Sequence, residues 1–286
     1  MDQRVARAAH PGRTASGLAS DPVTSTLVIP LVARALGDSV FPGFAVGDAL
    51  AAPALEQLDV DVGPFLRDKA SLFGVLSRTR LFRQLAFEFF DRFEQATGAN
   101  LGCGLASYFQ WLDRGTNHWL DADVPQVMQL RRRLLPPPGK HHREVAVDLS
   151  TEGWWQRLGL PARQSNKPVV VICEGVLMYL EAREVDHVLK EFGQNAPAGS
   201  EFLCDTLSWM ATGCAALHPS VCHTHAQFKW GPRRMRDFTA PHPRLVLLSE
   251  HPIMEAYDFS TALAFASFRA LWGVPLYGAV RLGVRG

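Results

Sequence analysis

The sequence has no excess of charge of either sign. It contains 29 Lys and Arg against 28 Asp and Glu, which gives a formal net charge of +1, and its basic residues cluster no further than Arg131-Arg132-Arg133. A nucleic-acid partner requires clustered cations that neutralise phosphates, so this composition predicts no nucleic-acid binding. We interpret the three arginines as a solvent-exposed helix face.

Long apolar segments and paired cysteines are also missing. No run of about 20 apolar residues could cross a membrane, and no apolar core of a secretory signal follows the N-terminus. These absences predict a cytoplasmic protein with no membrane partner. The five cysteines form no C-x-x-C motif, which favours reduced thiols. Cys222 lies near three histidines, but no second cysteine pair follows at zinc-site spacing, so we predict no metal site.

The apolar content changes its periodicity along the 286 residues. Residues 1–22 are rich in Gly, Ser and Pro and are predicted to be a disordered tail. Residues 23–286 are predicted to form a single domain, in which 23–95 are a helical lid region and 96–286 a Rossmann-like core with a cap around 206–240. The spacing of Leu81, Leu85 and Phe89 is typical of a helix face in the lid region.

After Gly98, short apolar runs alternate with helical stretches, which indicates an α/β fold with helices on both faces of a sheet. The final two of seven expected strands should pair antiparallel. The expected strands are Ala99–Cys103, His118–Ala122, Glu144–Leu149, Val169–Glu174, Glu201–Asp205, Arg244–Leu248 and Ala279–Val284. The expected helices between them are Val124–Leu135, with Asp123 as its N-cap, and Glu181–Asn195.

A glycine turn follows the first of these strands, in the run Asn100-Leu101-Gly102-Cys103-Gly104-Leu105. Glycines let backbone approach a ligand closely, and the acidic Asp123 that ends the second strand could accept both hydroxyls of a ribose. The third glycine of the dinucleotide pattern is absent, which favours an adenosine ligand without a pyrophosphate. Asp123 could instead serve only as a helix cap.

Four motifs in order carry a resemblance to a known family. They are Asn100 to Gly104, the segment Trp119-Leu120-Asp121-Ala122-Asp123-Val124-Pro125-Gln126-Val127, the pair Asp148-Leu149, and Glu174-Gly175-Val176-Leu177-Met178-Tyr179-Leu180. From about Thr26 to the end, the sequence resembles the leucine carboxyl methyltransferase superfamily and its branch of tetracenomycin-type polyketide O-methyltransferases. The resemblance implies a seven-stranded class I fold that uses S-adenosyl-L-methionine.

The resemblance also implies roles along the cofactor. Gly102 and Gly104 would contact its methionine portion, and Asp123 would bind the ribose. Asp148 and Leu149 would flank the adenine, although Asp148 could simply cap the segment that follows it.

At the other end of the cofactor, the resemblance places Glu174 near the sulfonium and amino group and Arg78 on the methionine carboxylate, with Arg80 as a competitor for that role. A carboxylate that closes an apolar strand is costly to bury without a partner, which favours a ligand role for Glu174. One departure stands out: the family usually has Asp-Thr-Arg where this chain has Ala106-Ser107-Tyr108.

Methyl transfer requires the acceptor oxygen to be held in line with the methyl carbon. A carboxylate is already ionised at neutral pH, whereas a phenol benefits from a general base. Tyr179, His223 and His225 are the candidate catalytic residues. The alternative for Tyr179 is packing, and the alternative for the histidines is ordinary hydrogen bonding in the cap.

The sequence therefore predicts an S-adenosylmethionine-dependent O-methyltransferase that acts on a small-molecule carboxylate or an enolic or phenolic hydroxyl, as in polyketide-type secondary metabolism. Two alternatives remain: methylation of a protein C-terminal carboxylate, and a degenerate scaffold that does not bind the cofactor. A homodimer is also left open.

Overall fold

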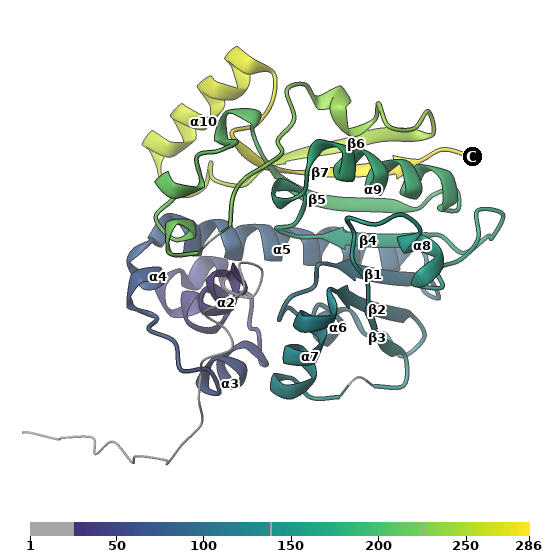
Figure 1. Cartoon of the computed structure of the whole chain (residues 1–286), viewed down its shortest axis with the longest axis horizontal. Helices are drawn as coiled ribbons and strands as arrows, with labels where there is room; N and C mark the ends of the chain where they lie inside the picture. The colour runs from purple at the N-terminus through teal and green to yellow at the C-terminus, as the bar shows by residue number, and fades with distance from the viewer. Residues whose placement is uncertain (1–25, 138, 225) are drawn as a thin grey trace, which may run out of the picture.

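One seven-stranded sheet organises the molecule (Figure 1). The computed structural model describes residues 26–137, 139–224 and 226–286. The predicted tail, residues 1–22, lies outside the described residues. The strands are β1 Thr97–Leu101, β2 His118–Asp123, β3 His142–Ala146, β4 Val169–Cys173, β5 Glu201–Leu207, β6 Leu245–Pro252 and β7 Tyr277–Val284. None of the helices in the described ranges is long and apolar enough to span a membrane.

The strand order is β3-β2-β1-β4-β5-β7-β6, with β7 antiparallel to both of its neighbours. The predicted α/β class, the seven strands and the antiparallel C-terminal pair are confirmed. All seven strands differ from their predicted bounds by a few residues; near the site, β1 ends before Cys103 and β3 ends before Asp148. The order of connection reverses between β1 and β4, where open α/β sheets bind their ligands.

The two faces of the sheet are covered by different helices (Figure 1). Alternate residues of β4 point to opposite faces: Val171 packs with Val188 and Phe192 of α9, while Ile172 packs with Phe82 of α5. The helix α9 spans Ala182–Asn195, close to its predicted bounds, and α8 spans Trp154–Arg157 beside it. Both faces of the central strands are therefore buried, as continuous apolar strands require.

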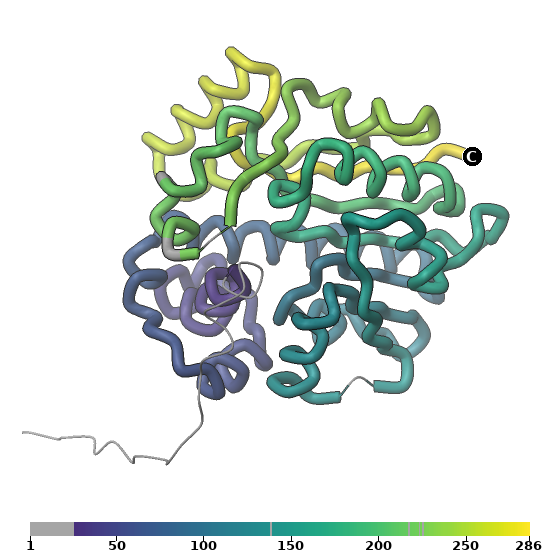
Figure 2. The backbone as a smooth tube through the Cα atoms, viewed as in Figure 1, coloured from purple at the N-terminus to yellow at the C-terminus, as the bar shows by residue number. Residues whose placement is uncertain are grey.

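The described residues before the sheet form four helices, and α5 crosses behind it (Figure 2). They are α2 Val28–Val40, α3 Ala51–Glu56, α4 Gly63–Arg67 and α5 Lys69–Arg92. The short α6, Phe109–Leu112, follows the glycine turn. The segment between β5 and β6 contains 3-10 turns at Trp209–Ala211, Ala215–Leu217, Val221–His223 and Met235–Phe238.

Two local predictions around α7, Pro125–Leu134, are wrong. Its N-cap is Val124 and not Asp123, because the Asp123 carboxylate accepts hydrogen bonds from the backbone N–H groups of Val124 and Gly104. The predicted solvent-exposed arginine face fails at Arg131, which is 1% exposed. Arg131 is buried because it forms ion pairs with two carboxylates of β2 and β3, those of Asp121 and Glu144.

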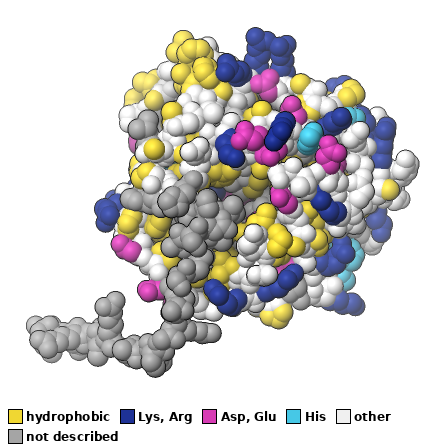
Figure 3. All heavy atoms as spheres, viewed as in Figure 1, with side chains coloured by type: hydrophobic (Ala, Val, Ile, Leu, Met, Phe, Trp, Pro, Cys, Tyr) yellow, Lys and Arg dark blue, Asp and Glu magenta, His cyan; other side chains and the backbone are white. Residues whose placement is uncertain are grey.

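The helix α10, Phe259–Trp272, was not predicted. The apolar residues of α10 are distributed around the helix and do not gather on one face, and none of its residues is buried. Its exposed large side chains include Phe259, Leu263, Leu271 and Trp272. Figure 3 shows hydrophobic side chains gathered at the end of the molecule that α10 occupies.

Candidate active site

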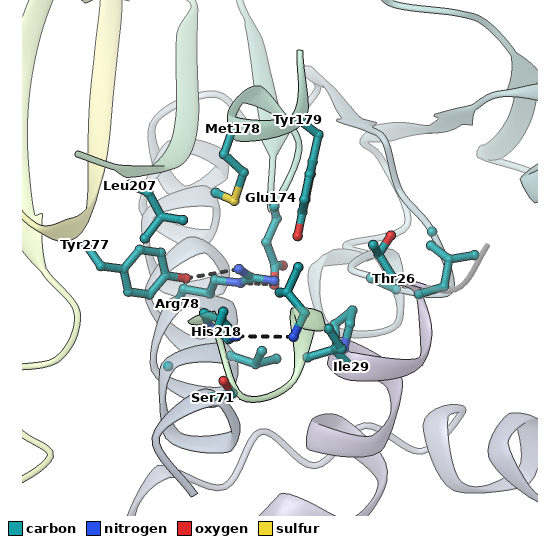
Figure 4. A pocket seen from close by; sticks show the side chains of 18 of the residues that line it. Thr26, Ile29, Ser71, Arg78, Glu174, Met178, Tyr179, Leu207, His218 and Tyr277 are labelled. Carbon is teal, nitrogen blue, oxygen red and sulfur yellow. Dashed lines mark hydrogen bonds and ion pairs between the residues drawn. The ribbon is translucent and has the colours of Figure 1, made fainter. Parts of the chain in front are cut away.

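A cavity of about 380 Å³ lies at the carboxyl ends of the central strands (Figure 4). Its lining comes from the turn after β1, the loop after β4, the helices α2 and α5, and the segment between β5 and β6. These parts are far apart in the sequence and meet beside the point where the strand order reverses. The cavity is within the size range of small-molecule sites.

The glycine turn forms one wall of this cavity. Gly102 and Gly104 both adopt positive φ, at 62° and 51°. A Cβ on Gly102 would lie 2.3 Å from Cγ2 of Val176, and a Cβ on Gly104 would lie 2.9 Å from Cδ2 of Leu27. Both backbone conformation and space therefore require glycine here, and the bare backbone faces the cavity.

The carboxylate of Asp123 stabilises the same turn by accepting backbone hydrogen bonds. Its Oδ2 accepts a hydrogen bond from the N–H of Gly104 at 2.8 Å, and its Oδ1 accepts one from the N–H of Val124 at 2.7 Å. Burial raises the pKa of Asp123, although these hydrogen bonds and Arg131 oppose the rise. The carboxylate thus connects the end of β2 to the glycine turn.

Arg78 extends from α5 to Glu174 and Tyr277 (Figure 4) and also pairs with the carboxylate of Asp205 on β5. Its Nε donates to Glu174 Oε1 at 2.7 Å, and its Nη1 donates to Asp205 Oδ2 at 2.9 Å and to the hydroxyl oxygen of Tyr277 at 3.0 Å. Two carboxylates face one guanidinium in this cluster. The cluster therefore has one more carboxylate than guanidinium, and its two members that line the cavity, Glu174 and Arg78, form the floor of the cavity.

The buried cluster favours an ionised Glu174. Burial alone would raise its pKa, but the positive charges of Arg78 and Arg34 and a hydrogen bond from Tyr108 outweigh burial, so the pKa of Glu174 lies below its usual value. At Asp205, burial dominates the attraction of Arg78, and the pKa is raised. Glu174 is thus the carboxylate of the floor that is most firmly ionised at neutral pH, suited to accept hydrogen bonds from a cation.

The opposite side of the cavity is mainly apolar, and its polar groups include Tyr179, His218 and Asp68. Burial raises the pKa of Tyr179 to about 12, and its ring packs against Phe228. Burial lowers the pKa of His218, and its Nδ1 accepts hydrogen bonds from the N–H groups of Ser220 and Val221. With Nδ1 acting as an acceptor, the neutral ring carries its proton on Nε2. Tyr179 and His218 are therefore both hydrogen-bond donors near pH 7.

Sequence comparison now adds to this geometry. A family model described as leucine carboxyl methyltransferase matches residues 2–193, about two thirds of the chain. The chain belongs to the leucine carboxyl methyltransferase family. The methyltransferase is 30% identical over 224 residues to the tetracenomycin polyketide synthesis O-methyltransferase TcmP of Streptomyces glaucescens, covering 78% of this chain and 80% of that protein. The resemblance predicted from the four motifs is confirmed.

More distant similarities concern other methyltransferases. The S-adenosyl-L-methionine-dependent methyltransferase dpfgK of Gibberella zeae is 28% identical over 179 residues, which span 58% of each protein. Among solved structures, the apo form of the S-adenosylmethionine-dependent methyltransferase SibL has a TM-score of 0.47 at 17% identity, covering 94% of this chain and 71% of that chain. The predicted class, an S-adenosylmethionine-dependent O-methyltransferase, is confirmed by the family match and the sequence relatives.

The cavity of the methyltransferase fits this cofactor. Besides the glycine turn and the Glu174 carboxylate, it contains the side chain of Asn100, which is 1% exposed and whose Nδ2 has no hydrogen-bond partner within the described part of the chain. Such a buried donor is costly unless a ligand accepts its hydrogen bond. A ligand that carries both a cation and hydrogen-bond acceptors matches these groups.

The predicted site residues divide into two sets. Arg78, Gly102, Gly104, Glu174 and Tyr179 all line the cavity. Each of their roles toward the cofactor or the acceptor stays a prediction.

The remaining predicted residues lie elsewhere. Asp123 touches the glycine turn but does not line the cavity, and Leu149 packs in the core. Asp148 is exposed, and its Oδ1 accepts a hydrogen bond from the N–H of Ser150, which is the local capping arrangement that the sequence left open. His225 lies outside the described residues, as does the side chain of His223. Roles at the ribose, at the adenine and for these histidines stay predictions.

Several cavity or cluster residues were missed by sequence reasoning. Asp205 follows the apolar residues Phe202–Cys204 of β5 as Glu174 follows the apolar strand β4, so the same argument from a carboxylate after an apolar run could have found it. His218 was considered only as part of a histidine-rich segment. Tyr277 and the hydroxyl of Tyr108 gave no local signal, because their partners are 66 or more residues away in sequence.

Proposed function

We propose that this O-methyltransferase acts on a flat, largely apolar small molecule through a carboxylate oxygen. The observation that carries this proposal is the pairing of the Glu174 carboxylate on the floor, suited to a cationic cofactor, with the donors Tyr179 and His218 on the opposite side. S-adenosylmethionine would supply the methyl group from its sulfonium. Glu174 would accept hydrogen bonds from the cofactor's amino group, and the glycine turn would lie along its methionine portion.

The polar groups opposite the floor favour a carboxylate over a phenol. Tyr179, with a pKa of about 12, donates rather than accepts a proton near pH 7. The neutral ring of His218 donates from Nε2 and is not free to act as a base at Nδ1. Asp68 accepts hydrogen bonds from Ser71 and Ser220, which lower its pKa against the effect of burial. A carboxylate needs no base and is oriented by donors.

The apolar lining supports a hydrophobic acceptor. Ile29, Met178, Leu207 and Phe228 surround the donors, and Phe265 of α10 lines the same cavity. An aromatic or polyketide-like acid would bury its rings against these side chains and present its carboxylate to the donors. The similarity to an O-methyltransferase of tetracenomycin polyketide synthesis supports this acceptor class.

The first test is calorimetric titration of the purified enzyme with S-adenosylmethionine and S-adenosylhomocysteine. Micromolar binding of either is expected, and absence of both heat and thermal shift would favour the degenerate scaffold. Transfer of labelled methyl to matched pairs of polycyclic aromatic acids and phenols then tests the acceptor. Preference for the acid is expected, whereas exclusive methylation of phenols, or of peptide C-termini, would refute the acceptor assignment.

We also propose that two copies associate through α10. Four of its large apolar side chains are 49% to 84% exposed. At roughly 150–250 Å² for each large side chain, their exposed parts would supply roughly half or more of the ~800 Å² per partner of a standard interface. Light scattering should give a dimer that Leu271→Glu dissociates, and a monomeric wild type would refute the association.

The free state of the described cysteines is consistent with a reducing, cytoplasmic location.

A further inference from the structure

Tyr108 lies buried against the floor of the cavity, directly after the glycine turn. Its side chain is 0% exposed, and its hydroxyl donates to Glu174 Oε2 at 2.5 Å. Its ring meets Trp111 edge to face, with centroids 5.7 Å apart. The hydroxyl is thus held in place by packing and points at the carboxylate that lines the cavity.

The two oxygens of Glu174 are held from different sides of the molecule. Oε1 accepts hydrogen bonds from Arg78 Nε at 2.7 Å and from Thr79 Oγ1 at 3.1 Å, both on α5. Oε2 accepts from Tyr108, on the segment after β1. A carboxylate held only at Oε1 could rotate about χ3, the terminal torsion of the side chain, because the distribution of this angle is broad. The tyrosine therefore determines the plane of the carboxylate.

We propose that Tyr108 is a positioning residue that orients Glu174 toward the positively charged amino group of the cofactor. This proposal rests on the proposed function. The hydroxyl provides a donor without a charge, so Glu174 gains a hydrogen bond and no positive charge beyond those of Arg78 and Arg34. An arginine, which the family usually has at the last position of its triplet, would add a third positive charge near Glu174, beside those of Arg78 and Arg34. The departure at Ala106-Ser107-Tyr108 thus replaces a charged group with a neutral donor to Glu174 and does not mark a lost site.

The direct test is Tyr108→Phe, which removes only the hydroxyl. Calorimetry at neutral pH should give an affinity for S-adenosylhomocysteine about tenfold lower than wild type, since a hydrogen bond to a charged group is lost. Tyr257→Phe is the matched control. Tyr257 is a partly buried tyrosine that packs against Phe41 and Phe73, outside the Glu174 cluster, so its variant should bind as the wild type does.

A pH series separates positioning from packing. Loss of the hydroxyl should raise the pKa of Glu174, so Tyr108→Phe should lose affinity at a higher pH than wild type as the solution is acidified. The other charged or titratable groups that act on Glu174 are unchanged in this variant: Arg34 of α2, Arg78 of α5, Asp205 of β5 and Tyr277 of β7.

A double-mutant cycle with Glu174→Gln provides a second criterion. If Tyr108 acts through Glu174, the loss of affinity caused by Tyr108→Phe should become much smaller when Glu174→Gln is already present. If the phenylalanine variant does not fold, 3-fluorotyrosine at position 108 keeps the hydroxyl and makes it a stronger donor. That variant should shift the loss of binding to lower pH.

The outcomes distinguish the two proposals. Absence of cofactor binding in the wild type would refute the proposed function and, with it, any role of Tyr108 toward the cofactor. Binding in the wild type with an unchanged affinity and pH profile in Tyr108→Phe would overturn only the positioning role. A variant that loses thermal stability but keeps its affinity, or additive effects in the cycle, would also overturn it.

Discussion

Alanine substitutions in the glycine turn test how strongly its backbone conformation and close contacts require glycine, measured as a loss of the free energy of unfolding. Replacing Gly102 with Ala would force a residue with a Cβ to adopt a φ of 62° and would place that Cβ 2.3 Å from Cγ2 of Val176. Left-handed backbone costs about 1–2 kcal/mol for a residue with a Cβ, and overpacking costs about 1–3 kcal/mol. We therefore expect Gly102→Ala to lower the free energy of unfolding by about 2–5 kcal/mol.

Two other glycines separate the cost of the backbone conformation from the cost of the steric contact. Gly159 has nearly the same φ, 63°, but the nearest atom to an added Cβ would be 3.8 Å away. Gly159→Ala should therefore cost only about 1–2 kcal/mol, the backbone term. Gly104→Ala should fall between the two, because its contact is the flexible end of Leu27 at 2.9 Å.

Urea unfolding of the three variants measures the order directly. A compensating change, Val176→Ala in the Gly102→Ala background, removes the crowding methyl group and should recover part of the loss, so the two changes should be non-additive. Equal destabilisation by Gly102→Ala and Gly159→Ala, or no recovery in the double variant, would refute the steric argument.

Three further outcomes are expected at single residues. Asp123→Ala should leave the enzyme folded but weaken binding of S-adenosylhomocysteine, because the N–H of Gly104 loses its acceptor; calorimetry with unchanged affinity would count against it. Glu174→Ala should lower both cofactor affinity and turnover, and wild-type kinetics would remove Glu174 from the site. Burial alone would raise the pKa of Asp121, but Arg131 and the hydrogen bonds from His142 and Trp119 together outweigh burial and lower the pKa. The stabilising contribution of Asp121 should therefore be present above about pH 4, the unfolded value, and be lost as pH falls further. Urea unfolding between pH 7 and 3 should therefore show a weaker acid dependence in Asp121→Asn, and an identical dependence would contradict this attribution.

The strands and the family could be recognised from the sequence because their signals are local. Apolar runs such as Val169–Cys173 report burial on both faces, and the glycines that follow β1 indicate a turn with positive φ. A carboxylate at the end of a buried strand, as at Glu174, is itself a local signal. These patterns were sufficient for the α/β class, the seven strands and five of the residues that line the cavity.

The partners of the site residues were decided only by tertiary structure. Arg78 meets Tyr277, 199 residues later, and Tyr108 meets Glu174 across 66 residues, distances in sequence at which periodicity carries no information. The burial of Arg131 has the same cause, since its carboxylate partners lie on β2 and β3 and become neighbours only when those strands pair. The sequence by itself determined where the backbone turns and which strands are buried; the packing of α5 and α7 against the sheet decided which charges meet.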